Sequence, residues 1–319
     1  MDKPFKSIDE QIAILESRGL ECDNNTRLVL EREGYYPVIN GYKDLFLDQR
    51  GDSCHELFVK GTKFSDIYRL FEFDRSLRLL MFEYFNKAEA ILKTVCSYRF
   101  AMAHKDSPEA YLDRRSYRVD AGYRKKIDTL IDDFEKVLCR SQKWKSDYKR
   151  DYIRHYENNH DNTPVWILMN YLMLGQAFKF YEFQPESMRN SIAKSFSDLY
   201  SETHEVDKRI SPRRLRLAYD HIKDFRNICA HDERLFCARV SPSRDVNLVG
   251  VLSDLELVLT EDDYKMLRRN ILLDALKLSD ELSNDASAKV LFAMGVNDLP
   301  SVFPKEILGS QSTRAMNLR

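Results

Sequence analysis

The sequence predicts an all-α protein: a helical bundle with a small helical subdomain at its N-terminus. Ten glycines and nine prolines are few for 319 residues, and Leu, Lys, Arg and Glu, which favour helices, are abundant. An apolar repeat at steps of three and four residues from about residue 65 to residue 103 predicts one long helix or two that abut. Helices of this kind, joined by short polar turns, pack against one another as a bundle.

Capping residues mark the starts of several helices. Ser7 and Glu10 form a capping box for a first helix, which Gly19 ends. Hydroxyl side chains are expected to cap three later helices: Thr163 before Pro164, Ser211 before Pro212, and Thr260 before Glu261. Helices after the long one are expected at about 120–138, 141–158, 164–181, 186–200, 212–235 and 261–284.

Three consecutive parts are predicted along the chain. Residues 1–60 have shorter helices and most of the early glycines, so they form the N-terminal subdomain. Residues 61–240 form the bundle, and residues 241–319 form a C-terminal arm with helices. Within this last part, the Val- and Leu-rich stretch up to residue 259 predicts either a short hairpin or an extended arm.

Basic residues are clustered, although 50 Lys and Arg nearly balance 51 Asp and Glu. A surface for nucleic acid must therefore come from local clusters. One cluster holds five basic residues and no acidic one: Lys208, Arg209, Arg213, Arg214 and Arg216. A second, at residues 140–154, interleaves basic residues with Trp144, Tyr148 and Tyr152, a mixture suited to phosphate contact and base stacking. Either cluster can instead be an ordinary solvated helix face.

Several classes of protein are excluded by what the sequence lacks. The six cysteines have no spacing of the zinc type, and neither a signal peptide nor a membrane-spanning run is present. There is no Gly-rich phosphate loop and no nucleophile-elbow serine, so kinases, NTPases and serine hydrolases are disfavoured. We expect a cytoplasmic protein without membrane association, metal or other cofactor.

The most informative segment spans residues 226–231. Arg226, Asn227 and His231 place a permanent cation, an amide and an imidazole within about two helical turns. Arginine can hold a phosphate through two parallel hydrogen bonds, and histidine can move a proton near neutral pH. These are the groups needed to cleave RNA without a metal, although many exposed helices carry Arg and His by chance.

An apolar stripe predicts that this segment lies on an amphipathic helix, with the polar residues facing away from the core. The stripe comprises Leu215, Ala218, Ile222, Phe225 and Cys229. Asp224 lies seven residues before His231, on nearly the same line of the helix, so it is expected to orient the imidazole.

The motif and two further blocks resemble Abi-like proteins (abortive infection, AbiD and AbiF type) of the HEPN superfamily. The motif block comprises Arg226, Asn227, Cys229, Ala230, His231, Arg234 and Leu235. The second comprises His155, Tyr156, residues 164–169, Gly175, Gln176, Phe180 and Tyr181, and the third Gly19, Leu20, residues 34–36, residues 40–42 and Phe46. The resemblance covers about residues 4–240. It departs at Asp232, where a second histidine is common, and at Phe236, where tryptophan or tyrosine is frequent.

This resemblance implies a metal-independent endoribonuclease that acts as a toxin in phage defence. In RNA cleavage the 2′-oxygen attacks the adjacent phosphorus, so we assign Arg226 to stabilising the phosphorane and His231 to acid or base catalysis. Asn227 is expected to hold its neighbours or the phosphate. RNA contacts are expected from Lys208, Arg209, Arg213, Arg214, Arg216 and Arg234.

The resemblance also implies partners. HEPN proteins commonly pair two copies of the motif in a homodimer, and an antitoxin or a small RNA is expected to restrain the toxin. Two other interpretations stay open: a non-catalytic RNA-binding scaffold that holds a structured small RNA, and a helical interaction protein with no RNA role.

Overall fold

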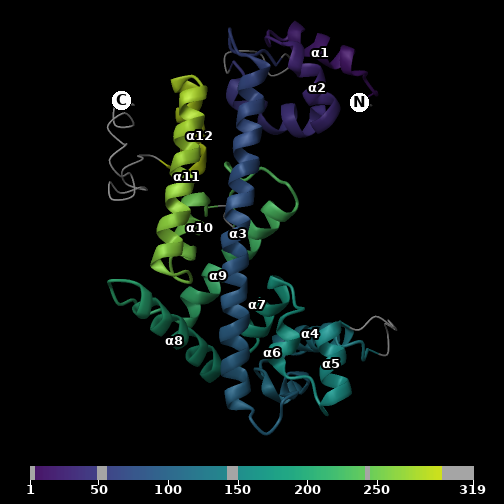
Figure 1. The fold of residues 1–319 in the computed structure, drawn as a ribbon, viewed down its shortest axis with the longest axis vertical. Coiled ribbons are helices and arrows are strands. Elements are labelled where there is room, and N and C mark those ends of the chain that lie inside the picture. The colour runs from purple at the N-terminus through teal and green to yellow at the C-terminus, as the bar shows by residue number, and fades with distance from the viewer. Residues whose placement is uncertain (1–3, 49–55, 142–149, 241–244, 297–319) are drawn as a thin grey trace. The chain divides into compact units, whose positions relative to one another are not determined.

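The computed structural model describes residues 4–48, 56–141, 150–240 and 245–296. The predicted all-α class is confirmed, because these residues form helices α1 to α12 together with short 3-10 and π turns (Figure 1). Within the described ranges, β-pairing is limited to isolated bridges, which join Glu21 to Lys63, Leu47 to Phe58 and Val240 to Val246.

The chain forms two compact units, each assembled from separate stretches. Unit 1 comprises Met1–Phe82, Ile228–Val249 and Lys265–Arg319, and unit 2 comprises Glu83–Asn227 and Gly250–Tyr264. Four helices contribute residues to both units: α3 (Phe64–Ala103), α9 (Pro212–Ala230), α10 (Leu248–Leu255) and α11 (Glu261–Glu281). The division of the chain at residues 60 and 240 stays a prediction.

The longest helix is α3, with 40 residues in one unbroken run, or about 60 Å at 1.5 Å per residue. Of the two alternatives that the sequence left open, the single helix is therefore observed (Figure 1). Its fully buried apolar side chains recur at steps of three and four, except that buried Asp74 takes the position between Leu70 and Leu77: Ile67, Leu70, Leu77, Met81, Phe85, Ala88, Leu92 and Cys96. This stripe supplies core to unit 1 in its first half and to unit 2 in its second half.

Unit 1 begins with the capping box that the sequence predicts. The Glu10 amide donates to Ser7 Oγ at 3.3 Å, and the Ser7 amide donates to the Glu10 carboxylate at 2.7 Å. Helix α1 (Ile8–Ser17) ends before Gly19, whose φ of +86° suits glycine. Helix α2 (Asn24–Glu33), a π turn (Tyr36–Asn40) and a 3-10 turn (Lys43–Phe46) follow. Helices α11 and α12 (Asn284–Met294) complete the unit's described part.

Unit 2 holds the shorter helices, which pack around buried aromatic side chains. These helices are α4 (Arg124–Val137), α5 (Asp151–Asn159), α6 (Val165–Met169), α7 (Leu174–Glu182) and α8 (Glu186–Thr203). Fully buried rings at Tyr111, Tyr117, Phe134, Phe180, Phe196 and Tyr219 fill the core.

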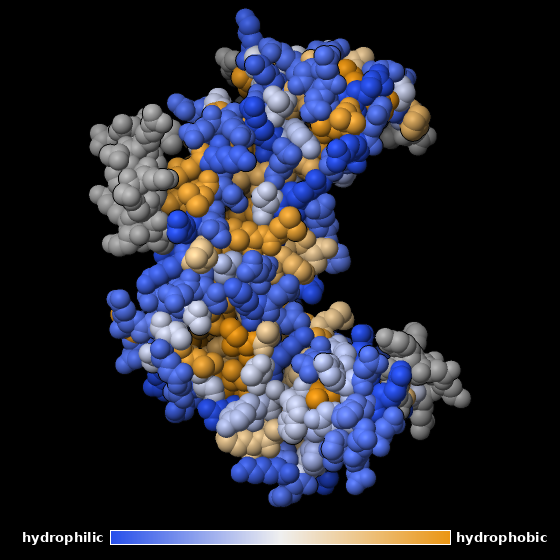
Figure 2. Space-filling model, viewed as in Figure 1, coloured by the Kyte–Doolittle hydropathy of each residue, from blue (hydrophilic) through white to orange (hydrophobic). Residues whose placement is uncertain are grey.

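On the face that Figure 2 draws, hydrophilic residues cover most of the surface and hydrophobic ones gather in separate patches.

Of the three caps predicted for later helices, two are confirmed and one is wrong. Ser211 Oγ accepts from the Arg214 amide at 3.2 Å, and Thr260 Oγ1 accepts from the Asp263 amide at 3.2 Å. By contrast, Pro164 itself is the N-cap of α6, and no side chain caps that helix. Thr163 is buried instead, and its backbone carbonyl accepts from the Tyr111 hydroxyl at 2.7 Å.

Other boundaries also differ from prediction. The helix predicted over 164–181 is two helices, α6 and α7, because residues 170–173 form a turn between them. The stretch after residue 240 combines the Val240–Val246 bridge with helix α10, so it is neither a simple hairpin nor an extended arm. No helix in the described part of the chain is long and apolar enough to cross a membrane.

Candidate active site at the end of helix α9

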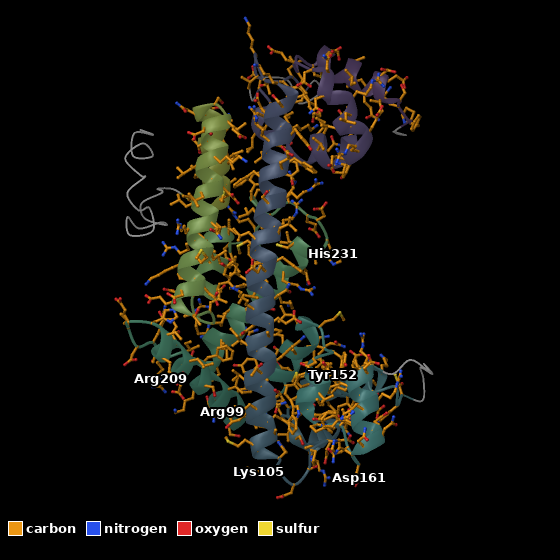
Figure 3. The ribbon with its side chains drawn as sticks, in the orientation of Figure 1. Arg99, Lys105, Tyr152, Asp161, Arg209 and His231 are labelled. Atoms are coloured by element: carbon orange, nitrogen blue, oxygen red, sulfur yellow. The ribbon has the colours of Figure 1, made fainter. Side chains whose placement is uncertain are left out.

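Helix α9 places Arg226 and Asn227 near its C-terminal end. Four residues of the predicted apolar stripe, Leu215, Ala218, Ile222 and Phe225, are fully buried, whereas Cys229 is half-buried. The helix ends at Ala230, however, so the predicted boundary at residue 235 is wrong. His231 follows the helix directly, and Figure 3 labels its side chain there.

The helix ends because Asp232 adopts the left-handed conformation, with φ at 57°. The Glu233 amide then donates to the Ile228 carbonyl at 3.1 Å, which is the long bond of a Schellman motif. Glycine usually occupies this position, since other residues are strained at positive φ. Aspartate adopts this conformation more readily than most other residues, and a contact of its side chain stabilises it here.

That contact comes from a group that we call the Asp74 clamp: Tyr42, Asp74 and Arg78, each at most 4% exposed. Arg78 pairs with Asp74 at 2.7 Å and with the Asp232 carboxylate at 2.6 Å. Asp74 in turn accepts hydrogen bonds from two backbone amides after the motif, those of Leu235 at 3.0 Å and Phe236 at 2.7 Å. The clamp thus fixes the turn that follows His231 to the first half of α3.

Tyr42 completes the clamp from the N-terminal segment of unit 1. Its hydroxyl donates to Asp74 at 2.7 Å and accepts from Arg78 at 3.1 Å, and its ring stacks on Phe236 at a centroid distance of 5.9 Å. Burial raises the pKa of Asp74, while bonds from Tyr42, Arg78 and the two amides offset part of the rise. Asp232 and Phe236, the departures from the usual motif, therefore both contact the clamp.

His231 itself is exposed. Among the residues that the structure describes, none donates to or accepts a hydrogen bond from its imidazole. The clamp consequently holds the backbone beside His231, while the His231 residue itself is exposed.

Arg226 lies opposite a carboxylate. Its Nε is 4.0 Å from Oε2 of Glu89, and its side chain is 25% exposed. The other oxygen of Glu89 pairs with Lys93 at 2.6 Å, so the carboxylate lies between two cations. Asn227 is exposed beside them on α9. Asp224 pairs with Lys223 at 3.3 Å, and its predicted role in orienting His231 stays a prediction.

Three of the six predicted RNA-contacting cations are held by acceptors of the protein. Lys208 pairs with Glu256 at 3.3 Å, Arg214 pairs with Asp254, and Arg234 donates to the Gly41 carbonyl at 2.7 Å. Arg209 and Arg213 are exposed, and within the described ranges neither forms an ion pair (Figure 3 labels Arg209). Arg216 is half-buried.

In the second basic stretch, Trp144 and Tyr148 lie outside the described residues. Tyr152 is described and is 62% exposed, and Figure 3 labels it. Its role in stacking stays a prediction. Among the described residues, no three His, Cys, Asp or Glu side chains gather as they would to hold a metal ion.

His221, which the sequence analysis did not include in the site, belongs to a buried ionic cluster. Its Nδ1 is 2.8 Å from Oδ2 of Asp254, and Asp254 is 2% exposed and also binds Arg214. The hydrogen bond with Asp254 raises the pKa of His221. This cluster joins α9 to α10 within unit 2.

Sequence reasoning did not identify the Asp74 clamp, although a signal was present. Asp74 lies seven residues after Ile67 and three before Leu77, so it occupies a position on the apolar stripe of α3. A charged residue at a core position needs a buried partner, and Arg78, one helical turn later, is that partner.

The chain is therefore an all-α protein that carries an Arg-x4-His motif, Arg226 and His231, at the end of helix α9. A family model described as Abi-like protein matches residues 28–237. The chain belongs to this family, which confirms the resemblance to Abi-like proteins. The family's name refers to abortive infection, a form of phage defence. Searches of curated proteins and of solved structures found no match.

Proposed function

We propose that this protein is a metal-independent endoribonuclease of the HEPN type, which acts in the cytoplasm as the toxin of a phage-defence system. One observation carries the proposal. A buried ionic network, the Asp74 clamp, fixes the turn after the motif and leaves the His231 imidazole exposed. Buried charges are costly to maintain, and the side chain beside the turn that this network fixes is an exposed imidazole, which can move a proton.

The residues suit cleavage by the RNA's own 2′-hydroxyl. His231 accepts the proton of that hydroxyl, the 2′-oxygen bonds to phosphorus, and the bond from phosphorus to the 5′-oxygen breaks. Arg226 stabilises the added negative charge of the phosphorane. The products are a 2′,3′-cyclic phosphate and a 5′-hydroxyl, so water is not consumed and a metal-bound hydroxide is not needed.

The departing 5′-oxygen needs a proton, and one imidazole cannot accept and donate a proton in the same step. A second copy of the chain would supply the second His231 and a second Arg226. We therefore propose a homodimer with the two motifs facing one RNA. An antitoxin or a small RNA would restrain it until infection.

The proposal is tested by expressing the wild type and the His231→Ala and Arg226→Ala variants in bacteria. Growth is scored, and RNA 5′-hydroxyl ends are sequenced. The wild type is expected to slow growth and create new ends, and both variants are expected to lose these effects. His160→Ala is the matched control, because His160 is also an exposed histidine but lies outside the motif.

The contrary result is also informative. Identical growth and identical RNA ends for the wild type and both variants would contradict the nuclease. If the purified protein nevertheless bound RNA, that outcome would favour the scaffold that holds a small RNA.

A further inference from the structure

A groove runs along the second half of α3, entirely within unit 2. Its first part has a volume of about 590 Å³, and a second hollow of about 530 Å³ continues it and shares Thr94, Ser97 and Trp166. Pockets of this size accept ligands as large as a nucleotide. The first part is lined by Asn86, Glu89, Ala90, Lys93, Thr94, Ser97, Trp166, Met169 and Asn170.

The groove exists because α3 carries short side chains on this face. Ala90, Thr94, Ser97 and Ala101 follow one another at steps of three and four, so they lie along one line of the helix. Trp166 of α6 stands beside this line and is 47% exposed, although it belongs to a helix whose other residues are buried. Tryptophan is highly buried on average, whereas the exposed Trp166 lines both hollows of the groove and offers a ligand an aromatic surface.

The polar groups of the groove are suited to a nucleobase. Within the described part of the chain, the side-chain amides of Asn86 and Asn170 form no hydrogen bond. An amide offers both a donor and an acceptor, which matches the edge of a base. Lys105, at the far end of the groove, is exposed and has no ion-pair partner among the described residues (Figure 3). Its ammonium can neutralise a phosphate.

We propose that this groove binds an unpaired base of RNA, which stacks on Trp166 and is hydrogen-bonded by Asn86 and Asn170. The inference rests on the proposed function, since it assigns the groove to the same RNA substrate. The groove adjoins Arg226, which also belongs to unit 2, because Glu89 lines the groove and lies 4.0 Å from Arg226. A paired base cannot stack on the indole, so the substrate is single-stranded at this position.

The lining favours RNA over a peptide helix. An amphipathic helix needs a continuous hydrophobic floor, whereas this groove interrupts its apolar residues with two amides, a carboxylate and a lysine. Stacking on one aromatic ring combined with amide contacts is the way in which proteins recognise single-stranded RNA.

Trp166 also provides the means to test the proposal. The chain has two tryptophans, Trp144 and Trp166, so a Trp144→Phe background leaves one fluorescent indole. The probes are single-stranded oligonucleotides with 2′-O-methyl groups, which lack the nucleophile and cannot be cleaved. The same strand annealed to its complement is the duplex control.

Single-stranded probes are expected to quench the Trp166 fluorescence, and the duplex is not. Trp166→Ala is expected to weaken binding of the single strand about 5- to 150-fold, the effect of losing one stacked base. Trp166→Phe, which retains a ring, is expected to restore most of the affinity. Phe292→Ala removes another exposed aromatic, outside the groove, and is expected to change nothing.

The proposal is overturned if no probe quenches Trp166, if the duplex quenches equally, or if Trp166→Ala binds like the wild type. Its failure can be told apart from failure of the nuclease. If Trp166→Ala binds the probe like the wild type and new RNA ends still depend on His231, only the proposal for the groove is rejected. If single strands quench Trp166 but no cleavage depends on His231, only the proposed nuclease function is rejected.

Discussion

At the scale of single residues, the Asp74 clamp is the most consequential feature of the molecule. A buried carboxylate beside a buried guanidinium is tolerated only when the remaining lone pairs are also satisfied. Here Tyr42 and the amides of Leu235 and Phe236 satisfy them. Removing the charge of Asp74 leaves the buried Arg78 with only the exposed carboxylate of Asp232 as a counter-charge.

We therefore expect Asp74→Asn to lower the free energy of unfolding by about 3 to 5 kcal/mol, as for other buried pairs that lose one member. Urea denaturation of the purified protein measures the change. Asp44→Asn is the control, because the Asp44 side chain is 64% exposed and its pairing with Arg234 is screened by water. A loss of less than about 1 kcal/mol for Asp74→Asn would mean that the clamp contributes little.

His221 predicts a dependence of stability on pH. The bond to Asp254 raises the pKa of His221 above its value of 6.5 in the unfolded chain, so folding favours the protonated ring. This contribution is fully present below pH 6.5 and is lost as pH rises through the higher folded pKa. Asp220 and Arg214 also act on this ring, in opposite directions.

The difference in unfolding free energy between the wild type and His221→Gln is accordingly expected to be largest in mild acid and to shrink toward alkaline pH. Denaturation curves at a series of pH values measure it. Because the substitution removes only one titrating group, the two proteins form a matched pair. A difference that grew with pH would show that the assigned direction of the pKa shift is wrong.

At the scale of elements, local chemistry predicted helix starts better than helix ends. Ser7, Ser211 and Thr260 cap as predicted, since a cap requires only residues within three positions. The end of α9 was missed because an aspartate replaces the usual glycine. The contact that holds Asp232 comes from Arg78, 154 residues away along the chain, and no local pattern can reveal it.

Helix α12 ends in the same kind of turn as α9, but with glycine at the left-handed position. Gly295 has φ at +90°, and the Val296 amide donates to the Leu291 carbonyl at 2.9 Å. A Cβ at this position would overlap the side chain of Asn247. Gly61 also has positive φ, at +83°, but a Cβ there would meet nothing within 4 Å.

Both Gly295→Ala and Gly61→Ala are expected to destabilise by about 1 to 2 kcal/mol through backbone strain. Gly295→Ala is expected to cost more, because Asn247 must also move. Thermal unfolding of the two variants against the wild type measures the difference. Equal losses would show that Asn247 relocates freely.

At the scale of the whole molecule, the sequence predicted the fold class and the family but not how segments assemble. Helical periodicity and the Arg-x4-His motif can both be recognised within a short segment of the sequence. Unit 1 is assembled from three separate stretches of the chain. This assembly depends on contacts such as that of Asp74 with Phe236, which are 162 residues apart. The groove beside Trp166 was likewise missed, since it requires α6 to lie against α3.

The net charge of the molecule bears on how its affinity for RNA depends on salt. The molecule carries a formal charge of −1, so long-range attraction to RNA is weak and binding must depend on a few local cations. Of the predicted cluster, Arg209 and Arg213 are exposed, whereas Lys208 and Arg214 are paired with carboxylates. Each contact between a cation and a phosphate adds about 0.7 to the slope of log affinity against log salt for single strands.

Replacing both Arg209 and Arg213 with alanine is thus expected to flatten that slope by about 1.4 for an uncleavable single-stranded RNA. Affinity is measured between about 50 and 200 mM salt, the range over which counterion release is resolved. Arg214→Ala is the matched control: because Arg214 is held by Asp254, its loss is expected to lower stability and to leave the slope unchanged. If the double variant kept the wild-type slope, the RNA would have to follow another face of the protein, and the basic residues 208–216 would be only a solvated end of α9.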